Sequence, residues 1–168
     1  MSRAAGVENR VGILPTRLVR SALLFASLVF IVSACGLASS GPARVDGWVE
    51  IQGKRTTVEI AYTPEEQAMG LGERDALAWG HGMYFEYDRP GFYSFWMKGM
   101  RFSIDIVWLR GGRIIDLDPN VPFERGTNGP TLRPAELADA VLEVPAGYAV
   151  AQGWRIGDRV KFERTRAR

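Results

Sequence analysis

A tryptophan and a lysine on one expected strand are the most distinctive candidates for chemistry in this sequence. Side chains alternate along an extended chain, so in Phe95-Trp96-Met97-Lys98 the indole and the ammonium would share one face. There Trp96 could stack on a sugar or an aromatic ring while Lys98 binds an anionic group. The alternative is a core tryptophan covered by the aliphatic part of the lysine, because aromatic side chains in β-rich proteins mostly pack.

Two charged residues extend this candidate site. Asp105 lies between two isoleucines on another expected strand. If it is buried it needs a partner, for which Lys98 or Arg101 is available, and its role is then either structural or that of a pocket acid with a shifted pKa. Arg74 follows a glycine-rich turn and could bind a carboxylate or a phosphate, or it could be an ordinary arginine at a helix end. The candidate ligand-binding residues are therefore Arg74, Trp96, Lys98 and Asp105.

Standard catalytic and metal-binding signatures are absent from the sequence. The acidic segment 116–120 begins like a calcium loop, but it lacks the glycine and the glutamate required at the sixth and twelfth positions. His81 is the only histidine and Cys35 the only cysteine, so no cluster of these ligands can form. No G-x-S-x-G nucleophile motif occurs. We therefore expect no metal and no cofactor.

Composition and charge exclude several classes of protein. The chain has 168 residues, of which 46% are hydrophobic and 24% charged, as in a globular protein and unlike a disordered or collagen-like chain. The net charge is +2, but the first 34 residues hold four of the 21 basic and one of the 19 acidic residues. The remainder is close to neutral, at −1. This balance gives no electrostatic reason to expect binding to nucleic acid.

The N-terminus has the pattern of a secretory signal peptide followed by a lipid attachment site. Arginines precede the apolar run 22–32, which is about half the length that a membrane-spanning helix needs. The sequence VSAC at 32–35 then resembles the bacterial lipobox, whose cysteine receives a diacylglyceryl group and becomes the mature N-terminus. The alternatives are an uncleaved anchor helix and an ordinary cleavage site. We expect residues 1–34 to form a lipoprotein signal peptide and Cys35 to be lipidated.

The residues after this cysteine predict the location and the attachment of the folded part. Gly36, rather than Asp, follows Cys35. By resemblance to lipoprotein sorting in bacteria with two membranes, this favours the periplasmic side of the outer membrane. Residues 35–43 are small and polar, as in a flexible tether, and a single domain is expected over 44–165. The expected partners are the membrane, through the lipid anchor, and a small molecule, a saccharide or an envelope protein.

Short strands dominate the expected fold, which is α+β and mostly β. The chain is predicted to form a compact antiparallel meander or a small barrel-like sheet with one or two short helices. Alternating apolar residues predict strands at 48–51, 57–61, 82–87, 92–97, 104–109, 113–117, 141–144 and 159–162.

Local signals predict the turns and the helices. The pair Gly111-Gly112 is typical of a tight hairpin turn. Thr63 as cap and Glu66 three residues later predict the start of a short helix, and 148–154 one further helical turn. The Pro- and Gly-rich segment 118–138 predicts a loop long enough to be functional.

The order of several motifs resembles that of a known family, the domain of unknown function 192, also called uncharacterised protein family 0127. The motifs are EIAYTPEEQAMGLGERDAL (59–77), HGMYFEY (81–87), FWMKGMRFSIDIVWLRGGRI (95–114), VLEVPAG (141–147) and IGDRV (156–160). The resemblance covers nearly all of residues 45–162 and implies a compact, β-rich domain that is often exported. Because the family has no established biochemical role, the resemblance implies no activity and no site residue for this chain. The chain departs from the family pattern at Gly72, where Met is usual, and at Gly99-Met100, where the family usually has Asn-Thr.

Three functions fit these observations. The first is a binding module for a small ligand or a saccharide, because all five Trp and five Tyr lie in the expected domain and the long loop could border a pocket. The second is an envelope protein that docks another protein through a strand or a loop. The third and least favoured is an enzyme with Asp105 as acid or base and Lys98 as its electrostatic partner.

Overall fold

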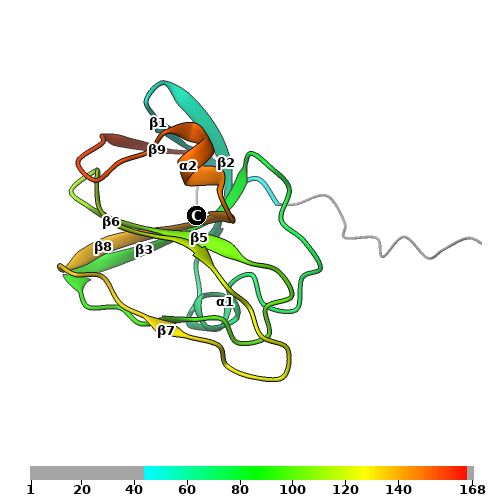
Figure 1. Cartoon of the computed structure of the whole chain (residues 1–168). Coiled ribbons are helices and arrows are strands. Elements are labelled where there is room, and N and C mark those ends of the chain that lie inside the picture. The colour runs from blue at the N-terminus through cyan, green and yellow to red at the C-terminus, as the bar shows by residue number, and fades with distance from the viewer. Residues whose placement is uncertain (1–43, 166–168) are drawn as a thin grey trace, which may run out of the picture. The chain divides into compact units, whose positions relative to one another are not determined.

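A curled seven-stranded sheet contains most of the regular structure in the computed structural model, which describes residues 44–165 (Figure 1). Its strands are β1 (Gly47–Ile51), β2 (Lys54–Ala61), β3 (His81–Gly91), β5 (Ile104–Arg110), β6 (Arg113–Val121), β8 (Ala138–Pro145) and β9 (Val160–Arg164). Across the sheet they follow the order β6-β5-β8-β3-β2-β1-β9. Neighbours are antiparallel except β2 and β3, which run parallel.

The sheet curls because its two outermost strands meet at one end. The backbone N–H of Ile114, at the start of β6, donates to the carbonyl of Asp158 at 3.0 Å. The N–H of Val160, at the start of β9, donates to the carbonyl of Gly112 at 2.9 Å. These bonds join opposite ends of the strand order, so the sheet forms a partly closed barrel. The mostly β, barrel-like fold predicted from the sequence is thereby confirmed.

Each face of the sheet carries its own hydrophobic core. The inner core, within the curl, is covered by α2 (Tyr148–Gln152), and the outer core is covered by α1 (Pro64–Met69) and a small ribbon of β4 (Phe95–Trp96) and β7 (Thr131–Leu132). Figure 1 shows α2 on one side of the sheet and α1 with β7 on the other. Strands packed on both faces need nearly continuous apolar sequence, which β5 and β8 have.

The locally encoded elements form where the sequence predicts them. The side chain of Thr63 accepts the N–H of Glu66 at 3.2 Å, and the Glu66 carboxylate accepts the N–H of Thr63 at 3.1 Å, which makes the predicted capping box of α1. Gly111 and Gly112 have φ of 54° and 70°, as a tight hairpin turn between β5 and β6 requires. The helical turn predicted at 148–154 contains α2.

Two expected boundaries differ in the structure. The long loop begins later than predicted, because β6 continues through Pro119 to Val121. Proline is tolerated there since β6 is an outer strand of the sheet and leaves one side of its backbone unpaired. The strand predicted at 92–97 shortens to the two residues of β4.

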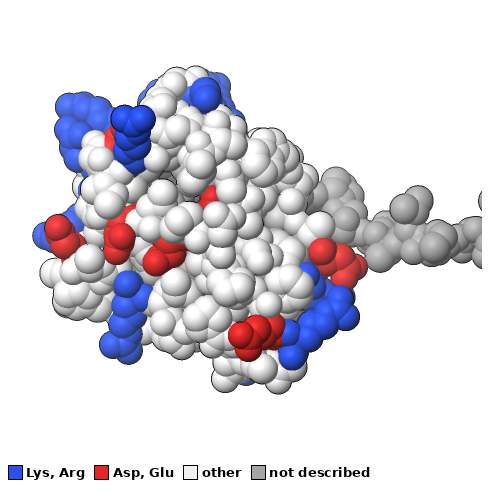
Figure 2. Space-filling view, viewed as in Figure 1, with Lys and Arg blue, Asp and Glu red and all other residues white. Residues whose placement is uncertain are grey.

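Surface charge is distributed in small groups. On the face shown in Figure 2, basic and acidic side chains lie near one another with uncharged surface between the groups. Arg101 pairs with Asp75 at 2.6 Å and with Glu73 at 2.9 Å. Within residues 44–165, no helix has the length and hydropathy that a membrane crossing requires.

Candidate functional site

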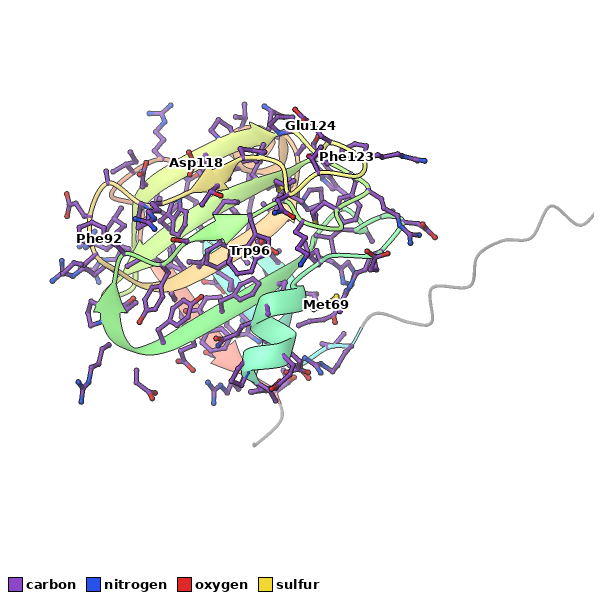
Figure 3. The ribbon with its side chains drawn as sticks, turned by 90° about the horizontal axis from the view of Figure 1, so that it is seen from below. Met69, Phe92, Trp96, Asp118, Phe123 and Glu124 are labelled. Carbon is purple, nitrogen blue, oxygen red and sulfur yellow. The ribbon has the colours of Figure 1, made fainter. Side chains whose placement is uncertain are left out.

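A cavity of about 410 Å³ opens on the outer face of the sheet, between α1 and the segment that carries β4. Aromatic side chains form much of its wall: Phe85, Tyr87, Tyr93, Phe95 and Trp96. The remaining wall consists of Pro64, Gln67, Ala68, Met69, Gly70, Leu71, Ser94, Lys98, Met100 and Glu143. Figure 3 looks onto this face and shows Trp96 beside α1, with Met69 on that helix. The volume lies in the range of small-molecule sites.

Ring contacts hold the aromatic wall in place. Tyr87 and Tyr93 stack with their ring centroids 3.5 Å apart, and the Tyr93 hydroxyl donates to the carbonyl of Arg89 at 2.6 Å. Phe85 meets Phe95 edge to face at 4.9 Å, and both are buried. Burial raises the pKa of the Tyr87 hydroxyl, so this group stays protonated at neutral pH. The wall is therefore a set of packed rings that exists before any ligand enters.

A buried glutamate lies on the sheet side of the cavity. Glu143 is 5% exposed, and its side chain has no hydrogen bond or salt bridge to any residue that the structure describes. Burial raises the pKa of its carboxyl to about 8, against the opposing effect of the positive charge of Arg74. Buried polar groups are normally hydrogen-bonded, because an unpaired group keeps the full cost of leaving water. Glu143 departs from this rule, and its unpaired carboxyl distinguishes the cavity.

The register of the sheet explains how Glu143 reaches the outer face. Met83 of β3 lies opposite Glu143 of β8 on one side and opposite Glu59 of β2 on the other. Residues that are opposite each other point to the same face, and Met83 belongs to the outer core. Both glutamates therefore point outward in one row of the sheet, separated by a single methionine.

Of these two glutamates, only Glu59 is paired with a cation. The guanidinium of Arg74 holds Glu59 with two hydrogen bonds, of 2.5 and 2.9 Å, in the forked geometry that suits a carboxylate. This pairing raises the pKa of Arg74. Glu143 has no such partner, although β8 and β2 both lie next to the central strand β3. The contrast supports a binding role for Glu143 and a structural role for the Arg74–Glu59 pair.

The structure brings two of the sequence-predicted site residues together. Trp96 and Lys98 both line the cavity and both are exposed, while the alternating residues Phe95 and Met97 are buried. Trp96 is 43% exposed, so part of the residue is accessible at the surface. Within residues 44–165, the ammonium of Lys98 forms no hydrogen bond or salt bridge. Cys35, the predicted lipidation site, lies outside the described residues.

Asp105 lies elsewhere, on the inner face of the sheet. Its carboxylate is fully buried and accepts three backbone N–H groups, from Asn120 at 2.8 Å, Gly147 at 2.9 Å and Ala149 at 2.8 Å. These amides take the place of the Lys98 or Arg101 side chain that the sequence led us to expect. The contacts tie the end of β6 and the start of α2 to β5, and they do not border the cavity.

Sequence reasoning missed Glu143, the residue that distinguishes the site. A signal existed: one glutamate interrupts the apolar run VLEVP at 141–145, where no adjacent cation can neutralise it. Among the residues that the structure describes, no group of three or more His, Cys, Asp or Glu side chains could hold a metal ion.

Together, the fold and the cavity define a class: a curled, mostly β domain that carries an aromatic pocket with a buried carboxyl on its outer face. The chain belongs to the DUF192 family, described as "Uncharacterized ACR, COG1430", whose model matches residues 47–162. This confirms the resemblance drawn from the sequence motifs. No curated protein matches the sequence.

Two crystal structures are similar to this chain. One is of a protein from Sinorhizobium meliloti 1021 described as a candidate transcription regulator; it is 27% identical, with a TM-score of 0.64, over 73% of this chain and 98% of the other. The second is of a protein of unknown function from Novosphingobium aromaticivorans DSM 12444. It is 32% identical, with a TM-score of 0.60, over 68% of this chain and 83% of the other.

Proposed function

We propose that this protein is a binding module for a small molecule, which enters the cavity on the outer face of the sheet. The observation that carries the proposal is the buried, unpaired carboxyl of Glu143 in a cavity of about 410 Å³ walled by aromatic rings. Ligand sites are typically concave and mostly apolar, with a few polar groups that fix the orientation of the ligand. Glu143 and Lys98 are such groups, and they lie among rings that can hold a flat body.

The exposed indole of Trp96 supports a ligand that contains a ring. A tryptophan with an accessible face can stack on an aromatic ring or on the apolar face of a sugar. The stacked pair of Tyr87 and Tyr93 adds a second flat surface to the same wall. A small aromatic molecule or a saccharide therefore fits the wall better than a fully flexible chain does.

We test this proposal by thermal unfolding of the full-length chain against sugars, cell-wall fragments, aromatic amines and aromatic acids. A ligand at a hundredfold excess over its Kd stabilises the folded state by about 2.7 kcal/mol. We expect Trp96→Ala to lose this shift while it still unfolds cooperatively without ligand, because the side chain is partly exposed.

The matched control is Phe92→Ala, which removes an exposed aromatic side chain from the same segment but outside the cavity wall. This variant should keep the full shift. A shift of equal size in wild type and Trp96→Ala would place the ligand elsewhere, and a panel without any active compound would overturn the small-molecule proposal.

A protein partner is the second candidate, because large apolar side chains are exposed on the face that carries the cavity. Met69 is 58% and Phe92 59% exposed, and Figure 3 shows both on the face that carries Trp96. Exposed apolar side chains that gather on one face favour an interface. Cross-linking on intact cells, with Phe92→Ala as the variant that weakens capture, tests this candidate.

We further propose that the domain is exported and lipid-anchored through Cys35, in the periplasm on the outer membrane where the host has two membranes. The support is the arginine-flanked apolar run and the lipobox-like VSAC sequence. We expect wild type to incorporate labelled palmitate and to sediment with membranes, and Cys35→Ser to do neither. Ser39→Ala is the control. If Cys35→Ser sediments with membranes like wild type, the apolar run is an uncleaved anchor helix instead.

A further inference from the structure

We propose that the ligand of this cavity is a small organic amine with a flat apolar body, and that Glu143 is the carboxylate that pairs with its protonated nitrogen. This inference rests on the proposed function, because it names the class of ligand for the same cavity.

No hydrogen-bond donor within residues 44–165 reaches the Oε2 atom of Glu143, which leaves this atom free to accept one from a ligand. Arg74 is the cation whose charge reaches this carboxyl, but both of its hydrogen bonds go to Glu59. Lys98 lines the cavity from an exposed position and forms no bond to Glu143. A carboxylate accepts several hydrogen bonds, and bonds from an ammonium are among the strongest because both partners are charged.

The space next to the carboxyl is open and bordered by an aromatic ring. Gly70 has no side chain, and a Cβ built on it would lie 3.7 Å from the Oε2 atom of Glu143 and 3.7 Å from the Cζ atom of Phe85. The ring and the carboxyl therefore border the same space. The faces of aromatic rings attract cations, so further rings in the wall, such as Tyr87 and Trp96, add to the preference for a positive ligand.

Binding of an amine changes the protonation of Glu143. Since the pKa of this carboxyl is about 8 in the free protein, it is mostly neutral at pH 7. The groups around it are Arg74, the Arg74-bound Glu59, the protonated Tyr87 and the exposed Lys98. An ammonium next to the carboxyl stabilises its charged form. Binding at neutral pH should therefore release close to one proton per ligand.

The test is isothermal titration calorimetry of the full-length chain with three probes that share an indole body. Tryptamine carries the amine, tryptophol has a hydroxyl in its place, and indole-3-acetate carries a negative charge. We expect tryptamine to bind about tenfold or more tighter than tryptophol, indole-3-acetate to bind most weakly, and only tryptamine to release a proton. Proton release is measured by repeating the titration in buffers of different ionisation enthalpy.

The variant Glu143→Gln keeps the size of the side chain but removes its acid. It should bind tryptamine no better than tryptophol, with the affinity for tryptophol unchanged. The matched control Glu136→Gln, at an exposed carboxylate, should behave like wild type.

Each unfavourable result has a separate meaning. Equal binding of tryptamine and tryptophol by wild type overturns the amine inference but leaves the small-molecule proposal in place. A preference for tryptamine that survives in Glu143→Gln overturns the role of this carboxyl. Absence of binding by all three probes at millimolar concentration overturns the amine inference, and the wider ligand panel then decides the proposed function.

Discussion

Replacement of Asp105 by asparagine is expected to lower the free energy of unfolding by at least about 1.5–3 kcal/mol. The Asp105 carboxylate is fully buried and accepts three backbone N–H groups. An asparagine can direct only one oxygen at these amides, and its own NH₂ group would face a donor on the other side. One or more buried N–H groups would then lose their charged acceptor, at about 1.5–3 kcal/mol for each such bond. Urea denaturation followed by tryptophan fluorescence measures the loss.

The control for this prediction is Asp88→Asn, which makes the same chemical change at an exposed position. It should change the free energy of unfolding by less than about 0.5 kcal/mol. A loss below about 1 kcal/mol in Asp105→Asn would show that the three amides do not depend on this charge. Any folded fraction of Asp105→Asn should still bind the ligand of the outer cavity, because Asp105 does not line it.

The second large effect is the contribution of Glu143 to the pH dependence of stability. Burial raises the pKa of its carboxyl from 4.5 to about 8, so over this range the folded chain keeps a proton that the unfolded chain has released. Stability then falls as the pH rises, by up to about 1.4 kcal/mol per pH unit. The contribution is fully present below a pH of about 4.5 and is lost as the pH rises through about 8.

Urea denaturation of wild type and Glu143→Gln between pH 5 and pH 8 measures this contribution. We expect Glu143→Gln to gain stability relative to wild type as the pH rises, because glutamine has no proton to release. Glu136→Gln should follow wild type, since Glu136 is exposed. Parallel curves for wild type and Glu143→Gln would contradict the raised pKa. If Glu143→Gln has a higher free energy of unfolding than wild type at pH 8, this would also indicate that the carboxyl is kept for function rather than for folding.

Elements with local signals could be predicted from the sequence, and the site could be predicted only in part. The capping box of Thr63 and Glu66 and the turn at Gly111-Gly112 each depend on residues a few positions apart. The alternation that exposes Trp96 and Lys98 is equally local. These predictions succeeded because backbone preferences within a short segment determine the structure.

The partners of the charged residues could not be predicted, because they depend on the order of strands in the sheet. Glu143 is bare because β8 lies between β5 and β3, two strands away from the Glu59 that binds Arg74. The donors to Asp105 are backbone N–H groups 15 to 44 positions later in the chain. Backbone amides occur at nearly every residue, so no pattern of side chains in the sequence predicts such a contact.

The curled sheet also has a consequence for the time at which this domain can fold. Strand β1 pairs along its whole length with β9, the last strand that the structure describes, so Gly47 lies opposite Arg164. Contacts between positions so far apart in the chain slow folding, because the intervening chain must be ordered first. A nascent chain cannot form this pair before β9 has been synthesised. For a protein that crosses a membrane unfolded, as the proposed signal peptide implies, late pairing of β1 with β9 would keep the chain competent for export until β9 has been synthesised.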